Sequence, residues 1–123
     1  TGAAIATTRV IPSLENKFDG MAIRVPAITV SLTDFTLVLK KDVTVEEVNN
    51  ALRKASEGKL KGILHIVDEP LVSSDFIGNP YSSNVDVAFT NVVGGSMVKI
   101  ISWYDNEWGY ANRLVELVEL AGK

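Results

Sequence analysis

The sequence predicts an α+β fold: a mixed, largely antiparallel sheet with helices on one face and a C-terminal helix. Runs rich in β-branched residues, typical of strands, are separated by segments with helical apolar spacing, and two of these runs meet at a Gly-Gly pair. The elements do not alternate strictly as strand and helix, which argues against a parallel α/β fold. With 123 residues, the chain has the length of one domain.

The first third of the chain is expected to hold a short helix and a long strand region. Residues 1–10 have a helical pattern that Pro12 would end. Residues 21–41 are rich in Val, Ile, Thr and Leu and therefore predict strand. The apolar alternation changes phase near Thr33 and Asp34, from Ile28, Val30 and Leu32 to Phe35, Leu37 and Leu39. This change indicates a bulge or two successive strands.

A second helix is predicted over residues 44–57, where the local signals are clearest. Thr44 and Glu47 have the spacing of a capping box. An apolar stripe follows at helical spacing, formed by Val45, Val48, Leu52 and Ala55. Gly58 is expected at the C′ position just beyond the helix.

The second half of the chain is expected to complete the sheet and to end in a helix. A short buried strand is predicted from Gly62 to residue 67, followed by a long loop over residues 68–83. Two strands then form a hairpin that turns at Gly94 and Gly95. The final helix, residues 108–121, is expected to bury one stripe, formed by Tyr110, Leu114, Leu117, Val118 and Ala121.

The composition excludes several classes of protein. The chain is 46% hydrophobic and 22% charged with a net charge of −3, as in globular proteins that bury a core, and it has no basic patch for nucleic acid. No apolar run is long enough to span a bilayer, and we expect a cytoplasmic protein. There is no cysteine and a single histidine, His65. This excludes a cysteine nucleophile and a histidine-built metal site from these residues, and we predict no metal site.

The stretch WYDNEWGY, residues 103–110, is the most distinctive in the chain. Either Asp105 or Asn106 could cap the final helix, and that structural role needs only one of them. The functional interpretation is that the Asn106 amide, which offers a donor and an acceptor, recognises a ligand such as another carboxamide. Asp105 and Glu107 without further convergent ligands do not favour a metal site.

Two other places could bind phosphate. Thr1 and Gly2 begin a helix, where a hydroxyl, free N–H groups and the helix dipole suit an anion, although a plain N-cap explains the same pattern. Arg24 lies in an apolar run and could bind a phosphate or form a salt bridge to Asp34 or Asp86.

The remaining polar residues suggest no catalytic machinery. His65, between two apolar residues, is interpreted as a structural histidine. The Ser73-Ser74-Asp75 stretch has no histidine partner nearby in the sequence, so a hydrolase triad is not predicted.

The motifs TGAA, RVP, ASEGKLKGIL, PLVSSDF and ISWYDNEWGYANR together resemble phosphorylating glyceraldehyde-3-phosphate dehydrogenases. The resemblance covers essentially the whole chain and matches roughly the last third of the family's sequence. It implies the fold of that family's catalytic domain, NAD as cofactor and a homotetramer. It also implies a glycolytic oxidation of glyceraldehyde 3-phosphate, with inorganic phosphate, to 1,3-bisphosphoglycerate.

The resemblance also implies site residues. Thr1, Gly2 and Arg24 correspond to positions that bind the phosphate group of the substrate. Asn106 corresponds to the asparagine that holds the nicotinamide carboxamide, and Tyr110 falls near the nicotinamide pocket. The interpretation from the residues themselves agrees at Thr1, Arg24 and Asn106.

The resemblance places the catalytic cysteine and the histidine base upstream of this sequence, and His65 does not match that base. The chain starts without Met, so we expect residues 1–123 to be the C-terminal part of the catalytic domain, without the N-terminal dinucleotide-binding domain. Alone it is expected to be inactive, and its final helix would lack the domain it packs against. The alternatives are an erythrose-4-phosphate dehydrogenase and a non-catalytic interaction module of the same fold.

Overall fold

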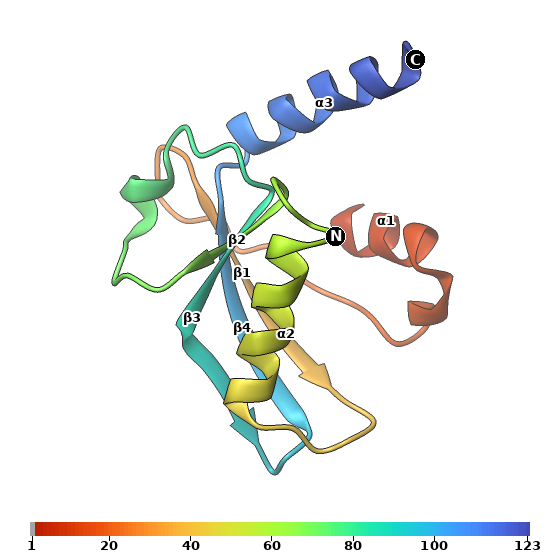
Figure 1. Ribbon diagram of the computed structural model, residues 1–123, viewed down its shortest axis with the longest axis vertical. Helices are drawn as coiled ribbons and strands as arrows, with labels where there is room; N and C mark the ends of the chain where they lie inside the picture. The colour runs from red at the N-terminus through yellow and green to blue at the C-terminus, as the bar shows by residue number, and fades with distance from the viewer. Residues whose placement is uncertain (1) are drawn as a thin grey trace.

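The computed structural model describes residues 2–123 and confirms the α+β class (Figure 1). The helices are α1 (Gly2–Val10), α2 (Val45–Glu57) and α3 (Trp108–Ala121), with two short 3-10 helices, η1 (Pro12–Leu14) and η2 (Ser73–Phe76). The strands are β1 (Ser31–Val38), β2 (Leu64–Val67), β3 (Ser83–Val93) and β4 (Met97–Tyr104). No helix among these residues is both long and apolar enough to cross a membrane.

The sheet is mixed and largely antiparallel, as predicted. Its strand order is β1-β4-β3-β2, with β4 antiparallel to both β1 and β3, and β2 parallel to β3. The predicted hairpin between β3 and β4 is confirmed. Its turn residues Gly94 and Gly95 have φ values of 58° and 81°, a left-handed conformation that favours glycine and matches the twist of the hairpin.

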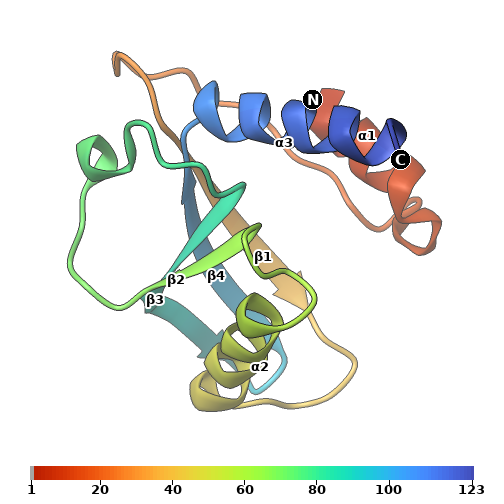
Figure 2. The ribbon, with the colours of Figure 1, turned by 45° about the horizontal axis from the view of Figure 1, so that its top comes forward.

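Helix α2 lies along one side of the sheet, against β2 and β3 (Figure 2). Its capping box is confirmed: the Thr44 hydroxyl accepts from the Glu47 N–H at 3.1 Å, and the Glu47 carboxylate accepts from the Thr44 N–H at 2.8 Å. The predicted apolar stripe is half-buried except for Val45, which is exposed at the first turn. The sequence predicts Gly58 at the C′ position, but in the structure it is the C-cap residue, which precedes C′. Its φ is −109°.

The core lies around Trp103 near the end of β4. Val30, Val67 and Phe76 are buried there, and Leu71 and Trp103 pack against them. The rings of Phe76 and Trp103 stack with centroids 5.7 Å apart. Because Trp103 directly precedes the turn into α3, this core fixes the strand end from which α3 starts.

The strand prediction over residues 21–41 is wrong in its first half. Residues 20–30 form an irregular, mostly exposed segment, and the strand begins only at Ser31. Val30 has a φ of 74°, a strained conformation for a β-branched residue, where the chain turns into β1. The predicted bulge or strand break near Thr33 and Asp34 is also wrong, because β1 pairs with β4 in one continuous register from Ser31 to Val38. Within β1 the half-buried positions are Ser31, Thr33, Phe35 and Leu37.

The predicted buried stripe on α3 is also wrong. Trp108–Ala121 does form a helix, but Gly109 is its only buried residue, and the apolar residues of the predicted stripe are exposed. Figure 1 shows α3 projecting away from the sheet toward the C-terminus. Helical spacing identifies residues that share a face, but another element must lie over that face to bury it, and no such element lies there within residues 2–123.

Candidate functional site

A pocket of about 290 Å³ lies where β4 passes into α3. It is lined by Ser82, Tyr104, Asp105, Asn106, Gly109, Tyr110 and Arg113. Asn106 and Tyr110, four residues apart, thus line one pocket. Sequence reasoning missed Ser82, Tyr104 and Arg113. Arg113 lies four residues after Gly109 on the same helix, and this helical spacing could have indicated that both residues face the pocket. No such local signal exists for Ser82, whose contribution depends on tertiary structure.

Asp105, not Asn106, satisfies the first N–H groups of α3. Its Oδ1 accepts from the N–H groups of Glu107 and Trp108 at 3.0 and 2.9 Å, and its Oδ2 accepts from the N–H of Gly78 at 2.8 Å. The residue is only 4% exposed. Burial raises the pKa of Asp105, but the hydrogen bonds from Trp108, Gly78 and Glu107 outweigh burial and leave this pKa below its ordinary value. The carboxylate is therefore held ionised.

This arrangement leaves the Asn106 side chain available to a ligand. The side chain is exposed, and its Oδ1 accepts only a long hydrogen bond, 3.5 Å, from the Ser31 hydroxyl. Within residues 2–123, its Nδ2 has no hydrogen-bond partner. The amide can thus offer a donor and an acceptor together to a carboxamide in the pocket. Tyr110, 66% exposed, adds an aromatic ring to the same pocket.

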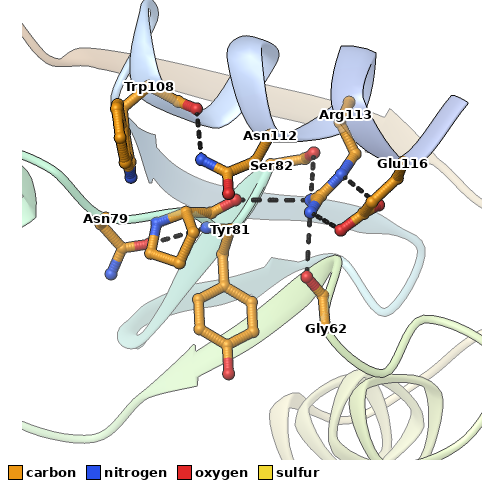
Figure 3. Close-up of polar contacts among 9 residues, drawn as sticks. Gly62, Asn79, Tyr81, Ser82, Trp108, Asn112, Arg113 and Glu116 are labelled. Atoms are coloured by element: carbon orange, nitrogen blue, oxygen red, sulfur yellow. Dashed lines mark hydrogen bonds and ion pairs between the residues drawn. The ribbon is translucent and has the colours of Figure 1, made fainter. Parts of the chain in front are cut away.

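Arg113 joins α3 to the rest of the chain (Figure 3). Its Nη1 donates to the Ser82 hydroxyl at 3.1 Å and to the carbonyl oxygens of Gly62 and Pro80, both at 3.4 Å. On the other side of the guanidinium, Glu116 accepts from Nε at 2.8 Å and from Nη2 at 2.5 Å. The arginine is therefore held in place by both backbone and carboxylate.

Two of the predicted phosphate residues, Gly2 and Arg24, do not join this pocket. Gly2 is the first residue of α1, Arg24 lies in the irregular segment, and Thr1 lies outside the described residues. Among residues 2–123, no hydrogen bond or ion pair joins Gly2 to Arg24, and neither lines the pocket.

The alternative of an ion pair between Arg24 and Asp34 or Asp86 is wrong. Asp34 instead pairs with Lys99 at 2.7 Å, and the buried Asp86 accepts from the N–H of Ala88 at 3.2 Å. The guanidinium of Arg24 is exposed and has no ion-pair partner among the residues that the structure describes.

His65, interpreted from the sequence as a structural residue, is half-buried and contacts two other side chains. Its Nδ1 lies 3.2 Å from Asn84 Oδ1, and its ring stacks on Tyr81 with centroids 4.9 Å apart. Asp75 accepts from the N–H of Val72 and caps η2. Over the described residues, no group of three or more His, Cys, Asp or Glu side chains is arranged to hold a metal ion.

Comparisons with known proteins identify the family of this chain. The family described as "Glyceraldehyde 3-phosphate dehydrogenase, C-terminal domain" matches residues 1–106. Glyceraldehyde-3-phosphate dehydrogenase of Mycobacterium avium is 54% identical over 123 residues, all of this chain and 36% of the relative. That of Priestia megaterium is 56% identical over 119 residues, 97% of this chain and 36% of the relative. Glyceraldehyde-3-phosphate dehydrogenase 1 of Bacillus subtilis is 54% identical over 123 residues, 100% of this chain and 37% of the relative. The chain thus spans about a third of the length of the curated relatives it matches, and it belongs to the glyceraldehyde 3-phosphate dehydrogenase C-terminal domain family.

Proposed function

We propose that this chain is the C-terminal part of the catalytic domain of a glycolytic, phosphorylating glyceraldehyde-3-phosphate dehydrogenase. The enzyme would oxidise glyceraldehyde 3-phosphate with NAD and inorganic phosphate to 1,3-bisphosphoglycerate. The observation that carries the proposal is that Asn106 and Tyr110 line one pocket in a chain of this family. Below, "the full-length enzyme" means the polypeptide of the relatives' length that carries this chain as its C-terminal portion.

The pocket suits the nicotinamide end of NAD. Its volume of about 290 Å³ is near the lower end of ligand sites, roughly 300–1,000 Å³. The free Nδ2 and weakly engaged Oδ1 of Asn106 match the two polar groups of a carboxamide. Bound there, NAD would accept the hydride. Asn106 would fix the rotation of the nicotinamide ring by hydrogen bonds to its carboxamide, and the ring of Tyr110 would cover the nicotinamide.

Arg24, with Thr1 and Gly2, is proposed to bind phosphate. Arg24 lies in an exposed segment, and its guanidinium has no carboxylate partner within residues 2–123, so it remains available to an anion. Gly2 begins α1, and the positive end of the helix dipole there favours an anion. Arg24 and Gly2 do not line the nicotinamide pocket, so the rest of the enzyme would be needed to bring phosphate and nicotinamide into one active site.

The partners follow from the same proposal. They are glyceraldehyde 3-phosphate, inorganic phosphate and the N-terminal portion of the enzyme, in a cytoplasmic homotetramer. The exposed apolar face of α3 supports a role for that N-terminal portion, because large apolar surfaces on globular proteins usually mark contacts.

The test is turnover by the full-length enzyme and its Asn106→Ala variant. We expect phosphate-dependent NADH formation from glyceraldehyde 3-phosphate. The variant should raise the KM for NAD about tenfold or more, with little change in the KM for the aldehyde. Faster turnover of erythrose 4-phosphate would reassign the substrate. A folded enzyme without any aldehyde-dependent NADH formation would favour a non-catalytic module.

A further inference from the structure

We propose that Asp105, Gly109 and Arg113 form a positioning row that sets the orientation of Asn106 and Tyr110 toward their pocket. This inference rests on the proposed function, because it assigns residues that act through Asn106. The three residues are spaced by four, and Asn106 and Tyr110 follow the first two by one position. The Gly109 N–H donates to the Asp105 carbonyl at 3.1 Å, so helical spacing extends back to Asp105. The row and the ligand residues are therefore neighbouring strips of one helix surface.

The first member of the row ties two distant segments together. The Oδ1 atom of Asp105 holds the turn that precedes α3, and its Oδ2 atom holds the N–H of Gly78, 27 residues earlier in the chain. Because a single buried carboxylate makes these contacts, the start of α3 cannot move relative to Gly78 without breaking a charge-assisted hydrogen bond. Asn106 is the next residue, so its backbone is fixed by the same contacts.

The second member permits a close approach of two backbones. Gly109 is buried, and a Cβ atom built on it would lie 3.1 Å from the carbonyl oxygen of Tyr81 and 4.0 Å from the Cα of Ser82. The first contact is tighter than ordinary van der Waals packing, and it is made to backbone, which cannot rotate away as a side chain can. Glycine at this position therefore lets α3 lie directly on the segment at Tyr81.

The third member holds the next turn of α3 to the same segment. Arg113 Nη1 donates to Pro80, Ser82 and Gly62, and Glu116 holds the other side of the guanidinium (Figure 3). The arginine side chain is only 22% exposed. Its planar fork serves several acceptors at fixed angles, which a lysine ammonium cannot reproduce.

Together the three contacts prevent rotation of α3 about its own axis. Each member of the row contacts the segment from Gly78 to Ser82. Beyond Arg113 the apolar residues of α3 are exposed, so among the described residues the helix is held at its first turns. Turning the helix would carry Asn106 and Tyr110 out of the pocket, because they lie beside the row. The members of the row also line the pocket, but their role here is to position Asn106 and Tyr110.

The experiment measures the Kd for NAD by equilibrium titration without aldehyde, and the steady-state kinetics, of the full-length enzyme carrying Gly109→Ala, with Gly122→Ala as control. Gly122 ends the same helix, and an added Cβ there meets nothing closer than 3.5 Å. We expect Gly109→Ala to raise the KM for NAD about tenfold or more while the KM for glyceraldehyde 3-phosphate stays unchanged. Gly122→Ala should leave both constants unchanged. The Kd for NAD should rise together with the KM for NAD in Gly109→Ala and stay unchanged in Gly122→Ala. Equal effects of the two substitutions on the KM for NAD would overturn the proposal.

A double-mutant cycle with Asn106→Ala separates this proposal from the proposed function. If the row acts through Asn106, adding Gly109→Ala to Asn106→Ala should have little further effect on the KM for NAD. Full additivity would overturn the positioning role. If Asn106→Ala alone leaves that KM unchanged, the proposed function fails instead, and the row with it.

A second variant covers the case in which Gly109→Ala does not fold. Arg113→Lys keeps the charge but loses the fork, so it should also raise the KM for NAD selectively. Arg53→Lys is its control, because Arg53 lies on α2, does not line the pocket, and makes an exposed ion pair with Asp68. A loss of kcat with both KM values unchanged would indicate only a smaller folded fraction, and would refute the positioning role.

Discussion

Asp105 and Asn106 are neighbours with similar side chains, yet the structure divides two roles between them. The sequence left open which one caps the final helix. Asp105 takes that role because its two carboxylate oxygens serve three N–H donors on two segments, and no single amide oxygen could do the same. Asn106 is then exposed, with its amide largely free. The most distinctive stretch of the sequence therefore places a structural residue, Asp105, next to Asn106, the residue proposed to bind the ligand.

The lowered pKa of Asp105 makes the stability of the chain depend on pH. In the unfolded chain this carboxyl has its ordinary pKa, so it binds a proton at a higher pH than in the folded chain. The stabilisation by ionised Asp105 is therefore complete above the ordinary pKa, and is lost as the pH falls through the lower pKa of the folded state. Asp105→Asn should lower the free energy of unfolding at neutral pH by about 1–3 kcal/mol, because an amide NH₂ would face an N–H donor.

Urea unfolding of both proteins at neutral pH and at about pH 3 measures this effect. The difference in unfolding free energy between the two proteins should narrow in acid, because the unfolded wild-type chain binds a proton at Asp105 at a higher pH than the folded chain does. Asp34→Asn is the matched control, because the exposed pair with Lys99 contributes at most about 1 kcal/mol. A difference that stays constant with pH would contradict the assigned ionisation of Asp105.

Arg24 can be tested with little risk to the fold. Its side chain is exposed and makes no ion pair within residues 2–123, so Arg24→Ala should leave the unfolding midpoint unchanged. In the full-length enzyme the same change should raise the KM for glyceraldehyde 3-phosphate, because a lost charge-assisted hydrogen bond costs about 1.5–3 kcal/mol, roughly tenfold or more. Arg24→Lys should restore part of the loss. An unchanged KM in Arg24→Ala would show that Arg24 does not contact the substrate.

At the scale of elements, the predictions that succeeded depend on local chemistry. The capping box of α2 and the Gly-Gly turn are set by residues within a few positions of one another. The failures concern what lies over an element. Residues 21–30 are rich in β-branched residues but find no partner strand, and the apolar stripe of α3 finds no covering element among the described residues. Periodicity gives the face of an element, whereas burial depends on tertiary contacts.

The hairpin turn supplies a stability test for β3 and β4. Gly95 has a φ of 81°, and a Cβ atom there would lie 2.8 Å from Cγ of Asp42. The Asp42 side chain can move, but the left-handed backbone remains, so Gly95→Ala should lower the free energy of unfolding by about 1 kcal/mol or more. Gly20→Ala is the control, because an added Cβ there meets nothing within 4 Å. Equal unfolding midpoints for the two variants would contradict the strain at Gly95.

For the whole molecule, the fold class and the sheet could be predicted, but the site only in part. Asn106 and Tyr110 could be expected to meet because they lie four residues apart, Asn106 just before the final helix and Tyr110 in its first turn. Ser82 joins their pocket only through the tertiary path of the chain, and Arg113 gains its role from Pro80 and Gly62 in the same way. Gly2 and Arg24, which are predicted to bind phosphate, lie on segments that contribute nothing to this pocket. The pocket at the start of α3 and the exposed Arg24 are thus separate parts of this chain.

A last prediction concerns catalysis by the isolated chain. The oxidation proposed above needs a nucleophile and a base near the aldehyde. This chain has no cysteine, and its one histidine, His65, is engaged by Asn84 and Tyr81. The purified 123-residue chain should therefore form no NADH from glyceraldehyde 3-phosphate, phosphate and NAD, whereas the full-length enzyme at the same concentration should. Circular dichroism of the isolated chain checks that it is folded. Aldehyde-dependent NADH formation by that chain would mean that its own residues provide the nucleophile and the base. The proposal that these groups come from the rest of the enzyme would then be wrong.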